Sequence, residues 1–407
     1  MAVINRRNMG PKAGRIFILR LAQALHRSGF PSGHLEGIVG SLEKRLRVRA
    51  NLVSLPTAMM GDFGTGEKRN PFILRVEPGE MDLEKQVALH DVARELSSGR
   101  ISLPMATRRI SEIEAAKSAG GTAVRLAAGA VVGAAAARLF GGGWPEMAAA
   151  FAGGFLVALE ARLLRGRPAS RIFESLAAVT VSLVVAAGML VVPIFPTMAV
   201  LGGLFMLLPG YTITVALDEL AARQMIAGAS RLASAITSFL FLGLGLILAG
   251  RLGQIIGATI PSSAIAVLPA WTDYTAIILG LLAFAAWFRA PLADYLPIVF
   301  AGGIGVAIQK WGSTPLGGPL AAFAAALVVS VSANIYARLS GRLAAVVIAP
   351  AILLMVPGSL GLRGILFVAS SDVVVGVGAA LQMALGAIAL VTGVLAGNLV
   401  QPLNRRD

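Results

Sequence analysis

The sequence predicts a polytopic α-helical membrane protein, in which ten transmembrane helices form two inverted five-helix repeats behind an N-terminal cytoplasmic α/β head. The composition is 56% apolar and 14% charged, with a mean hydropathy of +0.78, which is typical of membrane proteins. The charged residues are concentrated before residue 119. The segment LFMLLPG at residues 204–210 recurs as ILLMVPG at residues 352–358, and the same offset of 148 aligns Gly228 with Gly376 and Gly245 with Gly393.

The head is predicted to occupy residues 1–118 as a small α/β or α+β domain. Its first 30 residues contain six Lys or Arg and no uninterrupted apolar run, so they do not form a secretory signal, and the head is expected to stay in the cytoplasm. Amphipathic spacing predicts four helices, and apolar runs predict strands. The helices are expected at about 14–28, up to about 46, 82–98 and 103–117, the strands near 47–52 and 72–76, and the turns at Pro56-Thr57 and Pro78-Gly79.

The rest of the chain is predicted to consist of a first repeat at 119–251, an inter-repeat loop at 252–271, a second repeat at 272–401 and a cytoplasmic tail at 402–407. Most of its apolar segments approach the roughly 20 residues that a helix needs to cross a bilayer. Five spans per repeat force the second repeat to enter the membrane in the opposite orientation. The spans are expected at about 121–140, 145–164, 172–193, 196–220, 232–250, 272–288, 293–309, 317–337, 343–361 and 374–399.

The distribution of basic residues tests this order of spans independently. Twelve arginines fall on the predicted inner side, against four basic residues on the outer side. Both termini are therefore expected in the cytoplasm. The pI of about 11.2 does not indicate nucleic-acid binding, because the basic residues form no aromatic-interleaved reading motif. The absence of cysteine excludes disulfides and thiolate metal sites, and with three histidines neither a metal site nor a prosthetic group is expected.

The repeated Pro-Gly pairs, Pro209-Gly210 and Pro357-Gly358, are predicted breaks of transmembrane helices. Proline lacks an N–H and glycine accepts strained backbone, so the freed peptide groups can bind a small polar substrate near the membrane centre. Thr212 stands directly after the first break. These five residues are the predicted substrate-binding backbone of a transporter. The alternative is that each pair makes a simple kink or a helix end near the surface.

Polar residues inside the apolar segments supply further candidates. Asp218, Asp372 and Glu160 are predicted proton-coupling groups, because a carboxylate at membrane depth usually lines a cavity or a proton path. Alternatively, Asp218 lies at a helix end and Asp372 caps the last helix. Ser332 and Asn334 belong to a hydroxyl and amide cluster that can bind substrate. The same cluster can instead join helices by hydrogen bonds.

The order of these parts resembles the threonine/serine exporters of bacteria, which have a cytoplasmic head followed by ten spans. The resemblance in the head rests on Leu21-Ala22 with Leu25 and Ser28-Gly29, on Pro31-Ser32, His34 and Glu36, on Leu55-Pro56-Thr57, on Arg75-Val76, and on Asp82-Leu83 and His90. In the body it rests on the two Pro-Gly segments. It implies proton-driven export of threonine, serine and related small solutes through the bacterial inner membrane. The expected partners are a small amino acid, protons and lipid, and the oligomeric state stays open.

The head also contains residue types that occur in hydrolases. The family often has a Pro-Thr-His sequence, whereas this chain has Pro31-Ser32-Gly33-His34. His34, Ser32, Glu36 and His90 can be drawn as a catalytic group, but residue types alone do not establish convergence, so no catalytic residue is assigned. The alternative is that Ser32 caps a helix with His34 and Glu36 on its surface. An uncoupled pore and a membrane-anchored hydrolase are therefore the competing functional classes.

Overall fold

The computed structural model describes residues 11–64, 69–77, 79–116, 121–255, 257, 268–369 and 372–400. The chain forms two compact units. The first contains the described residues up to 116, called the head below, together with Asp218–Arg231; the second, called the body, contains the rest. The predicted turn at Pro78, the predicted boundary after residue 118, much of the predicted loop at 252–271 and the tail after 401 lie outside the described residues.

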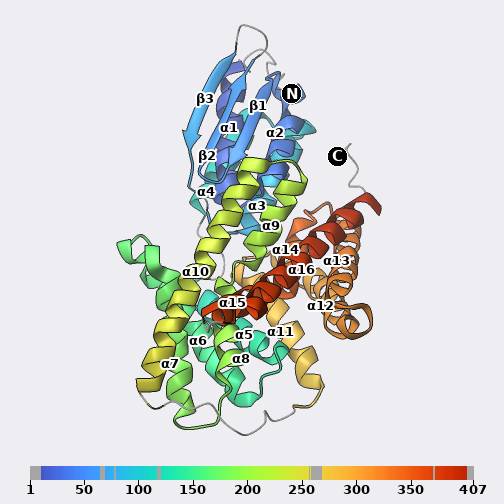
Figure 1. The fold of residues 1–407 in the computed structure, drawn as a ribbon. Coiled ribbons are helices and arrows are strands. Elements are labelled where there is room, and N and C mark those ends of the chain that lie inside the picture. The colour runs from blue at the N-terminus through green and yellow to red at the C-terminus, as the bar shows by residue number, and fades with distance from the viewer. Residues whose placement is uncertain are drawn as a thin grey trace. The chain divides into compact units, whose positions relative to one another are not determined.

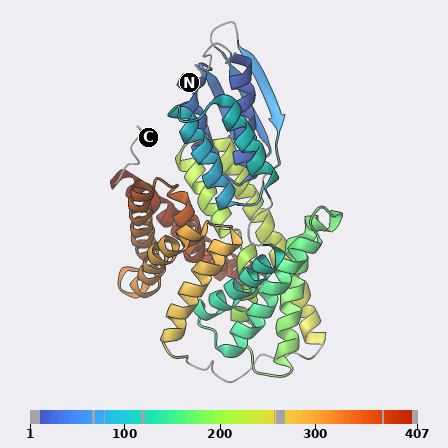
Figure 2. The ribbon, with the colours of Figure 1, turned by 180° about the vertical axis from the view of Figure 1, so that it is seen from behind.

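The head combines a three-stranded antiparallel sheet with four helices (Figure 1), so of the two predicted alternatives it is the α+β kind. The helices lie on one face of the sheet, as the view from behind also shows (Figure 2). Phe17, Leu21 and Leu25 of the first helix are fully buried, as its amphipathic spacing predicts. The elements are α1 Pro11–Arg27, α2 Ser32–Leu46, β1 Ala50–Leu55, β2 Ala58–Phe63, β3 Asn70–Arg75, α3 Leu83–Ser97 and α4 Leu103–Ala115.

The central strand β2 is the element of the head that the sequence analysis missed. Its sequence AMMGDF contains Gly61 and Asp62, which are poor strand formers. It is held between two partners, because Leu55 pairs with Ala58 across the predicted turn and Phe63 pairs with Asn70. A Cβ at Gly61 would lie 1.9 Å from the carbonyl oxygen of Asn51, so only glycine fits there. Pairing with β1 and β3 therefore outweighs the local preference.

The body is helical throughout its described part (Figures 1 and 2). Its first half continues into α9 and α10, which contribute Asp218–Arg231 to the first unit. The first-half elements are α5 Thr122–Leu139, α6 Trp144–Leu163, η1 Pro168–Ile172, α7 Phe173–Met189, α8 Pro196–Gly203, η2 Phe205–Leu207, α9 Gly210–Ala221 and α10 Met225–Ile255. The second-half elements are α11 Trp271–Trp287, η3 Leu292–Asp294, α12 Tyr295–Leu316, α13 Gly318–Ser340, α14 Ala345–Met355, α15 Gly358–Ala369 and α16 Val373–Val400.

Seven helical segments among the described residues are long and apolar enough to cross a membrane, and the bent pair formed by Pro196–Gly203 and Phe205–Ala221 raises the number to eight. Ten spans were expected. The expected spans at 145–164 and 272–288 are present as α6 and α11, but α11 has only 17 residues and α6 is not among the candidates. The chain is a polytopic membrane protein by this measure, and the number ten stays a prediction.

The sequence offset of 148 recurs in the packing of the body. A Cβ at Gly245 of α10 would lie 2.5 Å from the carbonyl oxygen of Ser175 and 2.7 Å from Ala178. At Gly393 of α16 it would lie 2.4 Å from the carbonyl oxygen of Phe323 and 2.8 Å from Ala326. Each residue of the second set stands 148 positions after its counterpart. The two halves therefore use equivalent glycines to bring equivalent helices into backbone contact.

The buried acids Glu146 and Asp294 form a second equivalent pair, also 148 positions apart. Glu146 accepts a hydrogen bond of 2.8 Å from the backbone N–H of Phe195, just before α8. Asp294 accepts one of 2.7 Å from the Arg342 guanidinium, just before α14, and another from the Tyr336 hydroxyl. In both halves, a carboxylate therefore fixes the segment that leads into the helix preceding the Pro-Gly pair.

The first helices of the two halves, α5 and α11, run antiparallel. Near the start of α5, Arg125 lies over the Trp287 ring at the end of α11, 4.8 Å from its centroid. Near the end of α5, Arg138 bonds to Asp273 at 2.9 Å and to Thr272 at 2.7 Å, both at the start of α11. Lys310 of α12 also contacts Asp273, at 2.9 Å. This ion-pair network ties the two halves together inside the body.

Candidate functional site

The structure breaks both helices at the repeated Pro-Gly pairs, as the sequence predicts. Leu208 and Val356, the residues before the prolines, have extended backbone with ψ of 119° and 131°. New helices begin at Gly210 and Gly358, so α9 and α15 follow the breaks directly. A separate bend of 55° lies ahead of the first pair, between Pro196–Gly203 and Phe205–Ala221. Both Pro-Gly pairs therefore interrupt a helix, the second of them within one candidate span, Ala345–Phe367, and the depth of the two pairs in a membrane stays a prediction.

The two breaks lie against each other. A Cβ at Gly210 would lie 2.3 Å from Val356 Cγ1 and 3.2 Å from the Cα of Gly358. Reciprocally, a Cβ at Gly358 would lie 3.2 Å from Leu208 Cβ and 3.5 Å from the Cα of Gly210. Side chains at these positions would hold the backbones apart, so the glycines permit a close approach of the two halves. The sequence predicted each break but not their contact.

Polar contacts surround the second break. The Gln309 side chain of α12 donates a hydrogen bond of 2.7 Å to the carbonyl oxygen of Met355, the last residue of α14. Gly386 of α16 faces the Pro357 ring, 3.0 Å from the position that a Cβ would occupy. Thr212, in the first turn after the other break, is half-buried. The breaks therefore lie inside the packed body, where irregular backbone can be held in a membrane protein.

Asn334 and its neighbours join two helices. The buried Asn334 amide donates to Asn398 Oδ1 at 2.9 Å, and the Ser330 hydroxyl interacts with the same oxygen at 3.1 Å. These bonds connect α13 with α16, which is the helix-joining role left open by the sequence. Ser332 is half-buried on α13. Asn398 was missed, although an asparagine in an otherwise apolar helix end was a visible signal.

The three predicted proton-coupling acids have different surroundings. Glu160 of α6 accepts a hydrogen bond of 2.5 Å from Thr180 of α7, while its buried Oε2 has no partner among the described residues. Asp372 is exposed and accepts a bond of 3.4 Å from the Val375 N–H, so it caps α16. Asp218 is half-buried in the first unit and interacts electrostatically with His34. The structure leaves the coupling assignments as predictions.

Glu219 has a partner that the sequence analysis did not find. Its carboxylate, 2% exposed, accepts two hydrogen bonds from Arg231 Nε, at 3.0 and 2.9 Å. The pair links α9 to α10, and each residue belongs to the same unit as the head. In that unit, the Gln224 amide also donates to Glu36 at 3.4 Å. The turn between the two helices is thus bonded to α2.

The hypothetical catalytic group of the head is not assembled. Ser32 is buried and begins α2, whose N-cap is Pro31, so the expectation that Ser32 caps the helix is wrong. His34 is exposed, and Glu36 accepts from the Ser54 N–H at 3.1 Å. Within the described head, no hydrogen bond joins Ser32, His34, Glu36 and His90. Burial lowers the pKa of His90 below its ordinary value.

The histidine with the most polar contacts, His26, was not among the candidates. It is 4% exposed, and its Nε2 lies 3.0 Å from the Pro56 carbonyl oxygen. Its Nδ1 lies 3.4 Å from the Ser54 hydroxyl. Burial lowers the pKa of His26, with a smaller contribution from the Arg231 charge. Because both side chains are buried, this pair fastens α1 to β1 and offers no access to a substrate.

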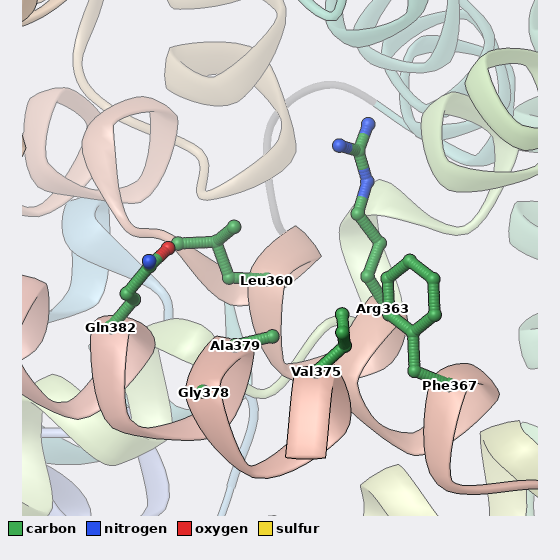
Figure 3. A pocket seen from close by; sticks show the side chains of 7 residues that line it. All are labelled: Leu360, Arg363, Phe367, Val375, Gly378, Ala379 and Gln382. Carbon is green, nitrogen blue, oxygen red and sulfur yellow. The ribbon is translucent and has the colours of Figure 1, made fainter. Parts of the chain in front are cut away.

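A cavity of about 340 Å³ lies between α15 and α16 of the body (Figure 3). Figure 3 shows Arg363 beside Phe367 and the side chain of Gln382 beside Leu360. Arg363 Nε is buried without a hydrogen-bond partner among the described residues. Three or more metal-binding side chains do not cluster anywhere in the described chain. The cavity is lined by Leu360, Arg363 and Phe367 of α15 and Val375, Gly378, Ala379 and Gln382 of α16.

Several curated proteins that resemble this chain are fungal. It is 28% identical over 362 residues to pheromone-regulated membrane protein 10 of Kluyveromyces lactis, covering 84% of this chain and 37% of the relative. The corresponding protein of Eremothecium gossypii is 27% identical over 371 residues, covering 86% and 49%. An uncharacterized protein of Schizosaccharomyces pombe is 26% identical over 375 residues, covering 86% and 48%. The chain spans half or less of the length of these relatives. No solved structure matches it.

Two family descriptions together account for most of the chain. Residues 16–253 match the family described as "Putative threonine/serine exporter", which includes the head and the first Pro-Gly break. Residues 273–400 match a second family, described as "Threonine/Serine exporter, ThrE", and this matched region includes the second Pro-Gly pair. Neither description is that of an enzyme family. The chain therefore belongs to the threonine/serine exporter family of multi-pass membrane proteins.

Proposed function

We propose that this protein is a secondary active exporter of threonine, serine and similar small amino acids. Its substrate is held between the two halves, beside the backbone of Pro209-Gly210 and Pro357-Gly358. Export is coupled to protons and proceeds by alternating access in the bacterial inner membrane. The head and both termini face the cytoplasm, as the distribution of arginines favours.

The contact between the two breaks carries this proposal. Helix breaks with glycine-to-glycine approach bring the ends of helices from both halves to one place in the body. The antiparallel packing of α5 and α11 supports opposite membrane orientations for the two halves. The equivalent glycines Gly245 and Gly393 support an origin by duplication. Ten spans in two inverted repeats are the topology that unites these observations.

Glu160 is the proton-coupling candidate that the geometry favours. One of its carboxylate oxygens binds Thr180, while the other is buried without a partner among the described residues, so it can accept a proton. Asp372, which caps α16 at an exposed position, supplies a matched acid for comparison. Glu160→Gln is expected to remove the dependence of threonine flux on a pH gradient while threonine exchange continues. Asp372→Asn is expected to retain both.

The test is threonine and serine flux in proteoliposomes that contain the purified full chain, with and without an imposed pH gradient. Gradient-driven flux above that of empty vesicles is the expected result. Flux that ignores the gradient contradicts proton coupling and favours an uncoupled facilitator. If neither amino acid is transported, the proposed substrates are wrong.

A further inference from the structure

The cavity between α15 and α16 is lined by the side chain of an arginine, a residue that is rare within membrane-spanning segments. Arg363 stands within a candidate span, Ala345–Phe367. A guanidinium at such a position usually faces a polar cavity and binds an anionic group. Here its Nε is buried without a hydrogen-bond partner among the described residues, and its side chain lines the cavity. Within the described part of the chain, this donor is therefore left for a group that enters the cavity.

A second polar side chain lines the same cavity. Gln382 is exposed on α16, although it stands within the apolar span Val373–Val400. Its amide has no hydrogen-bond partner among the described residues. Figure 3 shows the side chains of Arg363 and Gln382 extending from their two helices in the same general direction, with Leu360 between them. The cavity thus combines one charged donor, one amide and apolar walls, as small-molecule sites do.

Both helices that line the cavity also lie next to the second Pro-Gly pair, Pro357-Gly358. Arg363 stands five residues after Gly358, within the second turn of α15. Gln382 stands one turn before Gly386, which faces the Pro357 ring. A ligand in the cavity therefore lies along the helix that begins at the break. The volume of about 340 Å³ is at the lower end of the range for small-molecule sites, about 300–1,000 Å³.

The equivalent positions of the first half are filled differently. Counting back 148 residues, Phe367 and Ala379 correspond to Glu219 and Arg231. In the first half these two side chains form an ion pair that links α9 to α10, in which Arg231 Nε donates to both carboxylate oxygens of Glu219. In the second half the smaller Ala379 and Gly378 face the cavity, and a cation appears at Arg363, where the first half has Val215. The second half therefore has no counterpart of this ion pair, and it carries a cation where the first half has an apolar side chain.

We infer that the cavity between α15 and α16 binds the α-carboxylate of the exported amino acid through Arg363, with the Gln382 amide oxygen accepting from its ammonium or hydroxyl group. A guanidinium binds a carboxylate through two parallel N–H donors, which fixes orientation as well as charge. This inference rests on the proposed transport of small amino acids and adds a second place for the substrate, within the second half and along the helix that begins at Gly358.

The chain has no cysteine, so a single introduced thiol can report on the cavity. Ala379→Cys is placed in the otherwise unchanged full chain, reconstituted in neutral phosphatidylcholine vesicles. The rate of its modification by a methanethiosulfonate reagent is then measured. Serine and threonine are expected to slow modification, whereas serinamide, which lacks the carboxylate, is not. Equal protection by serine and serinamide would overturn the inference.

The role of the cation is tested in the same background. Arg363→Gln is expected to raise the serine concentration that gives half-protection about tenfold or more, since hydrogen bonds to charged groups are lost. Arg363→Lys keeps the charge but not the paired donors, and an intermediate shift is expected. Arg251→Gln, the same charge loss at an exposed position of α10, is the control and should give the wild-type value. An unchanged value in both Arg363 variants, with monodisperse protein, contradicts the inference.

The outcomes separate this inference from the proposed function. Threonine flux without protection of the introduced thiol leaves the transporter standing and removes this site. Protection by another amino acid, lost in Arg363→Gln, keeps the site even if threonine and serine are not transported. If none of the twenty amino acids protects, the site is wrong whatever the flux. Modification that responds to phosphatidylglycerol content instead of amino acids assigns Arg363 to a lipid phosphate and also overturns it.

Discussion

The two halves of the body share their backbone contacts and differ in their polar side chains. Gly245 and Gly393 make equivalent close approaches, and Glu146 and Asp294 fix equivalent segments. Beyond the breaks the two sequence repeats diverge, because Glu219 and Arg231, which belong to the first unit, form an ion pair where the second repeat has Phe367 and Ala379. Helix packing constrains backbone distances within tenths of an ångström, whereas polar groups need only find a partner. The differences therefore mark where the halves acquired separate roles.

The largest expected loss of stability follows from breaking the ion pair between Glu219 and Arg231, which has no counterpart in the second half. Arg231→Met leaves the Glu219 carboxylate, 2% exposed, without a counter-charge, and we expect a loss of about 3–5 kcal/mol of stability. Chemical unfolding of the full chain in mixed micelles measures it. Adding Glu219→Gln should recover part of the loss. Arg223→Met, in the exposed turn of the same helix pair, is the control with little effect.

Replacing the equivalent glycines Gly245 and Gly393 should lower the free energy of unfolding by similar amounts. Gly245→Ala and Gly393→Ala each place a Cβ within 2.5 Å of a backbone carbonyl oxygen, so we expect each to cost about 1–3 kcal/mol. Gly250→Ala and Gly378→Ala, on the same two helices, have nothing within 4 Å and should be neutral or stabilising in the same unfolding measurement. A cost in only one half would contradict the equivalent packing of the two.

The two glycines at the contact between the breaks should differ in how strongly their replacement reduces amino-acid flux. Gly210→Ala brings its Cβ to 2.3 Å from Val356 Cγ1, whereas Gly358→Ala meets Leu208 Cβ only at 3.2 Å. We therefore expect Gly210→Ala to reduce amino-acid flux more, because even about 1 Å of displacement near a site can cost a hundredfold in rate. Val356→Ala in the Gly210→Ala background removes the clashing methyl and should restore flux. No recovery would mean that the contact between the breaks is not what limits transport.

The smallest expected effect concerns the head. Burial lowers the folded-state pKa of His26 and His90 below 6.5, so the unfolded chain binds more protons as pH falls through this value. Stability is therefore complete above about pH 6.5 and is lost as pH decreases toward the lowered values. Resistance of the head to proteolysis on heating should be lower at about pH 5.5 than at about pH 7.5.

Two glutamine variants test whether the buried histidines cause this pH dependence, one at a buried histidine and one, as a control, at an exposed histidine. His26→Gln should make the resistance less dependent on pH, because it removes one of the two titrating groups from the buried part of the head. His34→Gln, at an exposed position of α2, should keep the wild-type dependence. The opposite direction, greater resistance at the lower pH, would contradict the lowered pKa values.

The sequence by itself determined the elements whose signals are local. Pro209-Gly210 and Pro357-Gly358 interrupt their helices because the proline lacks an N–H and the glycine accepts the change of backbone, whereas Pro350, which no glycine follows, stands inside α14. The amphipathic spacing of Phe17, Leu21 and Leu25 fixes the buried face of α1 in the same way. The offset between the two halves could be read before any contact was known.

Only the tertiary structure decided what depends on residues far apart in the chain. It brought Gly210 against Gly358, gave Glu219 its partner Arg231 and formed β2 from a segment with weak strand preference. It also left Arg363 facing a cavity while fastening Asn334 to Asn398. The spacing of apolar residues along the chain shows which face of a helix is apolar. It does not show which side chains another helix places against that face, and these side chains decide which polar groups become partners.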